Sequence, residues 1–346
     1  MIMTNDLVSL RDGRFPYTIN PFTQIAGQNR CLAYHILLNI KLGCHQTRKN
    51  MLETRKDQTV QLPDGRTLGF AEYGSTDGFP IFYFTGGNSS RLEGQWFDEA
   101  AIKHHVRLIV PDRPGFGLST FAPRRALLDW PDDVLELANK LSIDTFSIFG
   151  LSGGGPHVLA TAYKLPARLH RTAVVSGTAP PDMPDQYRGM WPPVRLIFST
   201  AKHLPTVNRF LLRQMAGFYS NKDQMLKRMK QAMPQPDIAL IEERPEVIEI
   251  FSEAAKEAHR HGVQGDAWEW QLYVRSWGFL LKDIAMPLKL WYGLYDQQVP
   301  IGMGRYLAGV LPNADLIEVE NGGHFSTVNN YIDDIFSYLC KQSDGA

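Results

Sequence analysis

Ser152 has the surroundings of a catalytic nucleophile. It lies in the pattern Gly-x-Ser-x-Gly, residues 150–154, between the apolar run 146–149 and a glycine-rich stretch that opens a predicted helix. A serine on so tight a turn between a strand and a helix has strained backbone angles, so Gly150 and Gly154 must be nearly free of side chains. In exchange, the hydroxyl stands clear of the sheet, where a substrate can reach it.

Two other residues could activate this serine. A serine hydroxyl is a weak nucleophile until a base takes its proton, and that base needs an acid to orient it. Asp296 and His324 each follow a predicted strand, 288–292 and 315–319 respectively. In an open parallel sheet, such loops gather at the edge where the serine lies, and the order serine, aspartate, histidine suits this topology. The spacing therefore predicts Ser152 as nucleophile, Asp296 as orienting acid and His324 as base.

The elements that position these residues alternate between short apolar strands and helices. The predicted strands cover residues 59–62, 67–73, 80–84, 107–110, 146–149, 172–175, 288–292 and 315–319. One predicted helix starts near Asp129, two others cover residues 155–164 and 302–311, and a last one ends near Cys340. This alternation indicates a mostly parallel sheet with helices on both faces.

The alternation stops between about residues 180 and 282. This segment is rich in Met, Phe and Trp, is interrupted by prolines, and shows its clearest helical spacing at 246–261. We interpret it as a helical cap inserted into the sheet domain. The sequence thus predicts an N-terminal extension at 1–56, a core at 57–180 and 283–346, and a cap at 181–282. Most of the large cap side chains should pack in the interior, and some should roof the pocket: Trp191, Met215, Trp268, Trp270 and Trp277.

Four motifs of this chain resemble those of the α/β-hydrolase superfamily, in a match that runs from about Thr59 to the C-terminus. They are residues 150–154, 112–119 (Asp-Arg-Pro-Gly-Phe-Gly-Leu-Ser), 293–296 followed by Val299-Pro300, and 322–324 (Gly-Gly-His). The resemblance implies the α/β-hydrolase fold, with a mostly parallel central sheet, flanking helices and a helical cap over the site. It also implies a triad of Ser152, Asp296 and His324 that needs no cofactor and no metal.

An oxyanion hole requires two fixed N–H donors that face the developing negative charge. One is expected from Gly153, directly after the nucleophile and at the start of a helix. The other is expected from the loop 85–87, where relatives carry His-Gly-x and this chain has Thr-Gly-Gly. We assign the second donor to Gly87. The next residues, 88–91 (Asn-Ser-Ser-Arg), could reach a polar group of the substrate.

Residues near these motifs receive structural interpretations. Asp112 and Arg113 are expected to form an ion pair under their loop. His157 lies on the helix after the nucleophile and is expected to pack there.

The composition of the 346-residue chain excludes several classes of protein. A formal net charge of zero provides no long-range field toward nucleic acid or a membrane surface. The three cysteines form no CxxC pair, which speaks against a disulfide framework or a zinc site and fits a reducing compartment. No uninterrupted apolar run reaches the roughly 18 residues that span a bilayer. The expected partner is a small-molecule substrate, and the oligomeric state stays open.

The first 56 residues have a different charge balance. They hold several Lys and Arg but only Asp6, Asp12 and Glu53 as acids, and the run from Cys31 to Cys44 favours a short amphipathic helix. An organelle-targeting peptide would have this charge, although a simple extension is the favoured interpretation. The favoured location is therefore the cytoplasm.

The predicted function is hydrolysis of a carboxylic ester, thioester or lactone through an acyl-serine. An alternative is a different reaction on the same triad, either carbon–carbon bond hydrolysis or cofactor-free perhydrolysis. Another alternative is a non-catalytic receptor for a small molecule on the same fold. Multiple turnover would separate an enzyme from a receptor.

Overall fold

The computed structural model describes residues 55–219 and 221–341. All of the described residues belong to one compact unit, Leu52–Ala346. The predicted amphipathic helix at Cys31–Cys44 and the question of a targeting peptide lie outside the described residues, and the domain boundaries stay predictions.

An eight-stranded sheet forms the centre of the described region, in the order β1-β2-β4-β3-β5-β6-β7-β8. β1 and β2 pair antiparallel, β2 also runs antiparallel to β4, and all other neighbours are parallel. This confirms the predicted mostly parallel sheet. The strands are β1 (Gln58–Gln61), β2 (Thr67–Gly74), β3 (Phe79–Phe84), β4 (Val106–Pro111), β5 (Phe146–Leu151), β6 (Leu169–Val175), β7 (Leu288–Gly293) and β8 (Ala314–Val319).

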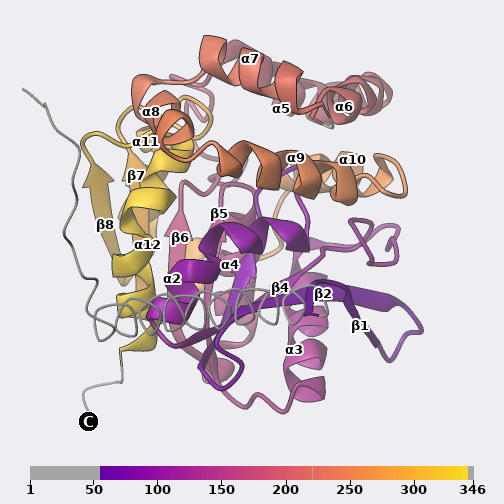
Figure 1. Ribbon diagram of the computed structural model, residues 1–346, viewed down its shortest axis with the longest axis vertical. Helices are drawn as coiled ribbons and strands as arrows, with labels where there is room; N and C mark the ends of the chain where they lie inside the picture. Colours follow the sequence, from indigo (N-terminus) through magenta and orange to yellow (C-terminus); the bar gives the residue numbers. More distant parts are fainter. Residues whose placement is uncertain (1–54, 220, 342–346) are drawn as a thin grey trace, which may run out of the picture. The chain divides into compact units, whose positions relative to one another are not determined.

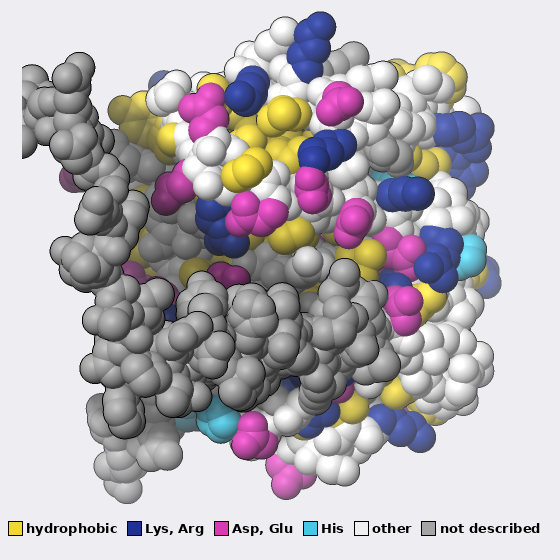
Figure 2. Space-filling model, viewed as in Figure 1, with side chains coloured by type: hydrophobic (Ala, Val, Ile, Leu, Met, Phe, Trp, Pro, Cys, Tyr) yellow, Lys and Arg dark blue, Asp and Glu magenta, His cyan; other side chains and the backbone are white. Residues whose placement is uncertain are grey.

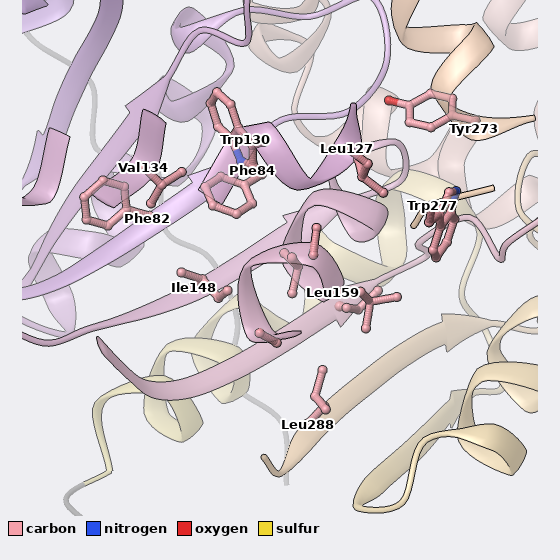
Figure 3. Packing of buried hydrophobic residues seen from close by; sticks show 14 of the residues in the cluster. Phe82, Phe84, Leu127, Trp130, Val134, Ile148, Leu159, Tyr273, Trp277 and Leu288 are labelled. Atoms are coloured by element: carbon pink, nitrogen blue, oxygen red, sulfur yellow. The ribbon is translucent and has the colours of Figure 1, made fainter. Parts of the chain in front are cut away.

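Helices cover both faces of this sheet (Figure 1). Because strand side chains alternate, Phe82 and Phe84 face one side, where they pack in a cluster with Trp130 and Leu159 (Figure 3). Tyr83 packs on the opposite side. The flanking elements are η1 (Arg91–Phe97), α2 (Asp98–Lys103), η2 (Leu127–Asp129), α3 (Trp130–Lys140), α4 (Gly154–Lys164), η3 (Pro166–Arg168), η4 (Leu281–Asp283), α11 (Ile301–Val310) and α12 (His324–Cys340).

The segment between β6 and β7 is helical, as its sequence predicts. In Figure 1, α5, α6 and α7 form an outer layer, and α9 and α10 lie between that layer and the sheet. We refer to α5–α10 as the helical insertion. Its helices are α5 (Pro192–His203), α6 (Pro205–Tyr219), α7 (Lys222–Ala232), α8 (Gln235–Glu243), α9 (Glu246–Ala258) and α10 (Gln264–Tyr273).

The described surface carries charges of both signs. On the face in Figure 2, Lys and Arg side chains alternate with Asp and Glu side chains, in agreement with the formal net charge of zero. None of the helices in the described ranges is long and apolar enough to cross a membrane.

Candidate active site

The predicted nucleophile lies on a sharp turn between β5 and α4. Ser152 has a φ of +56°, which is strained for a residue with a side chain and confirms the strain expected from its motif. A Cβ on Gly150 would lie 2.8 Å from the Gly154 backbone, and one on Gly154 would lie 2.1 Å from the Phe84 carbonyl oxygen. The backbone thus approaches so closely on both sides of Ser152 that only glycine fits.

Asp296 and His324 meet at the ends of β7 and β8. His324 Nδ1 lies 2.8 Å from Asp296 Oδ2, while Asp296 Oδ1 accepts the backbone N–H groups of Gln298 and Val299 at 2.8 and 2.9 Å. Because a carboxylate only accepts, Nδ1 carries the proton and Nε2 is left with a free lone pair. The pair therefore has the tautomer that a general base requires.

The carboxylate of Asp237, on α8 of the helical insertion, fixes the backbone of the predicted base. Its oxygens accept the N–H groups of His324 at 2.8 Å, Phe325 at 3.1 Å and Ser326 at 2.8 Å, and the Ser326 hydroxyl at 2.7 Å. These are orphan donors at the first turn of α12, whose N-cap residue is a glycine. No pattern in the sequence points to Asp237, because it lies 87 residues from His324 and in no motif.

The charge around His324 favours its protonated form. Burial opposes that form, but the carboxylates of Asp296, Asp237 and Glu93 favour it, and the pKa of His324 lies above its ordinary value. Glu93 itself is buried, accepts a hydrogen bond from the Tyr83 hydroxyl, and has a pKa raised by burial.

Two cavities flank Ser152. The smaller, of about 140 Å³, is lined by both Ser152 and His324, and among the described residues no hydrogen bond joins these two side chains. Because hydrogen bonds at such sites are often long before substrate binds, the lack of a bond between these two side chains does not exclude the predicted pair. The larger cavity, of about 280 Å³, is lined by Ser152 and mostly by apolar side chains of the helical insertion.

Gly87 and Gly153, the predicted oxyanion donors, lie side by side. A Cβ on Gly153 would be 3.2 Å from the Gly87 nitrogen, and both glycines line the larger cavity. Within the described residues, neither amide donates to a protein acceptor. Two free N–H groups thus lie next to the serine.

A buried charged cluster lies behind these amides. Glu269, on α10, has one carboxylate oxygen 3.0 Å from Arg113 Nε and 2.9 Å from His157 Nε2, and the other against Arg125. Burial alone would raise the pKa of Glu269, but the guanidinium charges of Arg125 and Arg113 and the contact with His157 hold it well below its ordinary value. The Tyr273 hydroxyl oxygen lies 3.0 Å from the same carboxylate and 3.0 Å from the Gly153 carbonyl oxygen, and its one proton serves these two acceptors.

This cluster corrects one prediction. Asp112 and Arg113 do not pair with each other: Asp112 pairs with Arg91 at 2.9 Å, and Arg113 pairs with Glu269. Adjacent residues in an extended segment point to opposite sides, so the two side chains find different partners. His157 is buried, as predicted, and its Nε2 lies 2.9 Å from Glu269; burial lowers the pKa of this imidazole.

The loop after Gly87 contributes only in part. Asn88 lines both cavities and Ser89 the smaller one. Ser90 donates to the Ala254 carbonyl instead, and Arg91 is buried in ion pairs. These contacts exclude Ser90 and Arg91 from the substrate side.

The large side chains predicted for the cap lie in different surroundings. Trp191, Met215 and Trp270 line the larger cavity. Trp277 is buried in the main core, and Trp268 donates to the Arg125 carbonyl. Among the described residues, no group of three or more His, Cys, Asp or Glu side chains could hold a metal ion.

Comparison with known proteins agrees with this architecture. A family described as "alpha/beta hydrolase fold" matches residues 80–331. The chain belongs to the α/β hydrolase fold family. Hydrolysis is the class of activity that this membership supports.

The individual relatives are distant. "Uncharacterized hydrolase YcgS" of Bacillus subtilis is 27% identical over 196 residues, which span 53% of this chain and 66% of that protein. A thermophilic esterase from Thermogutta terrifontis has a TM-score of 0.60 at 21% identity, over 82% of this chain and 96% of the other. The enol-lactonase from Burkholderia xenovorans LB400 has a TM-score of 0.58 at 19% identity, over 82% and 100%. The two solved structures share the fold with this chain.

Proposed function

We propose that this protein is a serine hydrolase that cleaves a carboxylic ester, thioester or lactone through an acyl-serine intermediate. The observation that carries the proposal is the contact of 2.8 Å between His324 Nδ1 and Asp296, which leaves Nε2 available as a base in a residue that lines the same cavity as Ser152. The relatives named as an esterase and an enol-lactonase support the same class of bond.

The proposed reaction balances through one proton carrier. His324 Nε2 takes the proton of Ser152 as the Oγ–carbon bond forms, and the amides of Gly87 and Gly153 stabilise the oxyanion. The proton then passes to the leaving oxygen as the bond between acyl carbon and leaving group breaks. A water molecule, deprotonated by the same nitrogen, then attacks the acyl carbon. The bond between the acyl carbon and Oγ breaks, His324 returns the proton to Ser152 Oγ, and the acid is released.

The two cavities suggest where each half of the substrate binds. His324 must protonate the leaving group, so the alcohol or thiol portion belongs in the smaller cavity that His324 lines. The acyl chain then belongs in the larger cavity, which His324 does not line and whose walls include Val194, Ile197 and Leu211. We therefore propose a substrate with an apolar acyl group.

The decisive experiment combines turnover with active-site labelling. Ser152→Ala is expected to lower kcat by at least about three orders of magnitude on p-nitrophenyl esters and to abolish labelling by a fluorophosphonate. A folded Ser152→Ala variant with near-normal rates would exclude Ser152 as the nucleophile. A wild-type protein that binds ligands without turnover would instead indicate a receptor.

Matched substitutions test the orientation of the substrate. Val194→Trp, in the larger cavity, should shift preference toward short acyl chains and leave the preference for the alcohol unchanged. Met225→Trp, in the smaller cavity, should do the reverse. The opposite pattern would show that the substrate binds the other way round.

A further inference from the structure

We propose that Glu269 is a positioning residue that holds the two oxyanion donors in place through separate partners. The proposal rests on the function proposed above, because it needs Gly87 and Gly153 to be those donors. Glu269 belongs to α10, so the helical insertion would contribute to the catalytic geometry as well as to the walls of the pocket.

The first partner is Arg113, which reaches the loop that carries Gly87. Its Nη1 donates to the Thr85 carbonyl at 2.6 Å and its Nη2 to the Gly86 carbonyl at 2.8 Å, while its Nε lies 3.0 Å from Glu269. The Gly86 carbonyl and the Gly87 N–H belong to one planar trans peptide, in which the two groups point in opposite directions. A guanidinium that holds this carbonyl therefore turns the Gly87 N–H away from itself and fixes its direction.

The second set of partners holds Gly153. The Gly153 carbonyl oxygen lies 3.0 Å from the Tyr273 hydroxyl oxygen and 3.1 Å from His157 Nδ1, within hydrogen-bond reach of both. Both of these side chains also contact Glu269, at 3.0 and 2.9 Å. The preceding peptide, which contains the Gly153 N–H, is held on its carbonyl side by the N–H of Gly155 at 3.0 Å. Gly153 is thus fixed from both ends.

The energetics favour a positioning role over a purely stabilising one. Removing a carboxylate and two guanidinium groups from water is unfavourable, so a buried ionic cluster is weak evidence for stability. All three side chains are nearly inaccessible to solvent. The cluster instead fixes the orientation of a backbone segment. The guanidinium of Arg113 is planar and rigid, and its hydrogen bonds hold the backbone of the predicted oxyanion loop.

Arg125 provides a matched control. It is as buried as Arg113 and pairs with the other oxygen of the same carboxylate, and its hydrogen bonds reach neither the 85–87 loop nor Gly153. Arg113→Lys and Arg125→Lys therefore each replace one guanidinium group of this cluster by an ammonium group. Only the first removes hydrogen bonds to the predicted oxyanion loop.

The experiment measures kcat, KM and the melting temperature for both variants on a short p-nitrophenyl ester. Loss of one oxyanion donor costs about 100- to 1000-fold in kcat, so a displaced donor in Arg113→Lys should cost about 10- to 100-fold with KM within about threefold. Arg125→Lys should keep kcat within about threefold at a similar loss of melting temperature. Tyr273→Phe, which loses one hydroxyl and keeps the ring, should lower kcat by about tenfold.

Two outcomes would overturn the proposal. One is an equal loss of kcat in Arg113→Lys and Arg125→Lys at equal melting temperature, because the effect would then follow charge or stability alone. The other is a folded Tyr273→Phe protein together with a folded Arg113→Lys protein that both keep wild-type kcat. Fluorophosphonate labelling of the wild type separates these results from failure of the proposed function, since an unlabelled wild-type protein would show that the serine assignment itself is wrong.

Discussion

The two sides of Ser152 are built in different ways. On one side, Asp296 and His324 stand on loops that directly follow β7 and β8, and they contact each other at 2.8 Å. On the other side, the Gly87 loop is held by Arg113, whose counter-charge is Glu269 on α10. The first side is assembled by the ends of neighbouring strands, and the second by a charge that comes from the helical insertion.

This difference teaches which residues a motif can reveal. A triad side chain must have one chemistry at one strand end, so its type and spacing are recognisable. A residue that holds the backbone of an oxyanion donor only needs to lie close to that backbone. It can come from any element and from any distance along the chain. Glu269 and Asp237 both belong to the helical insertion. Glu269 contacts Arg113 on the side of Gly87, and Asp237 contacts the backbone of His324 on the other side.

The largest expected effect sharpens the comparison on the triad side. Asp296→Asn keeps the shape of the side chain, but its amide can present an N–H to His324 and so favour the wrong tautomer. We expect kcat to fall by about four orders of magnitude with the fold intact, measured on the same ester as the wild type. Asp283→Asn, an exposed carboxylate near β7, is the control and should keep the wild-type rate. A rate for Asp296→Asn within tenfold of the wild type would mean that another carboxylate orients the base.

A smaller effect concerns pH. His324 must be neutral to act as a base, and its pKa lies above the ordinary 6.5 because the neighbouring carboxylates outweigh its burial. The value of kcat/KM should therefore rise with pH up to a plateau. Below the pKa of His324 it should fall about tenfold per pH unit, and it should reach half of the plateau value above pH 6.5. A pH-stat assay from pH 5 to 9 measures this midpoint. A midpoint at or below 6.5 would contradict the electrostatic environment described for His324.

The sequence predicts most of the sheet and brings Asp296 and His324 to neighbouring strand ends, where they contact each other, while the triad roles stay predictions. It fails at specific contacts. Each observed strand lies within a few residues of its predicted range, because buried parallel strands are short apolar runs bounded by turn residues. The partner of Arg113 could not be predicted in the same way. Its ion pair with Glu269 joins residues 156 positions apart and depends on how the helical insertion packs, which local pattern does not encode. Proximity in the sequence instead favours the neighbouring Asp112 as the acidic partner of Arg113.

The smallest expected effect tests whether Asp237 supports the triad side as Glu269 is proposed to support the other. Asp237 accepts four hydrogen bonds at the start of α12, and Asp237→Asn would place an amide N–H against at least one of these donors. Losing hydrogen bonds to a buried charge should cost about 2 kcal/mol of unfolding free energy, measured by urea denaturation. Because Asp296 still orients the imidazole, kcat should fall less than about tenfold. A loss of kcat as large as that of Asp296→Asn, without a loss of stability, would instead place Asp237 in the proton relay.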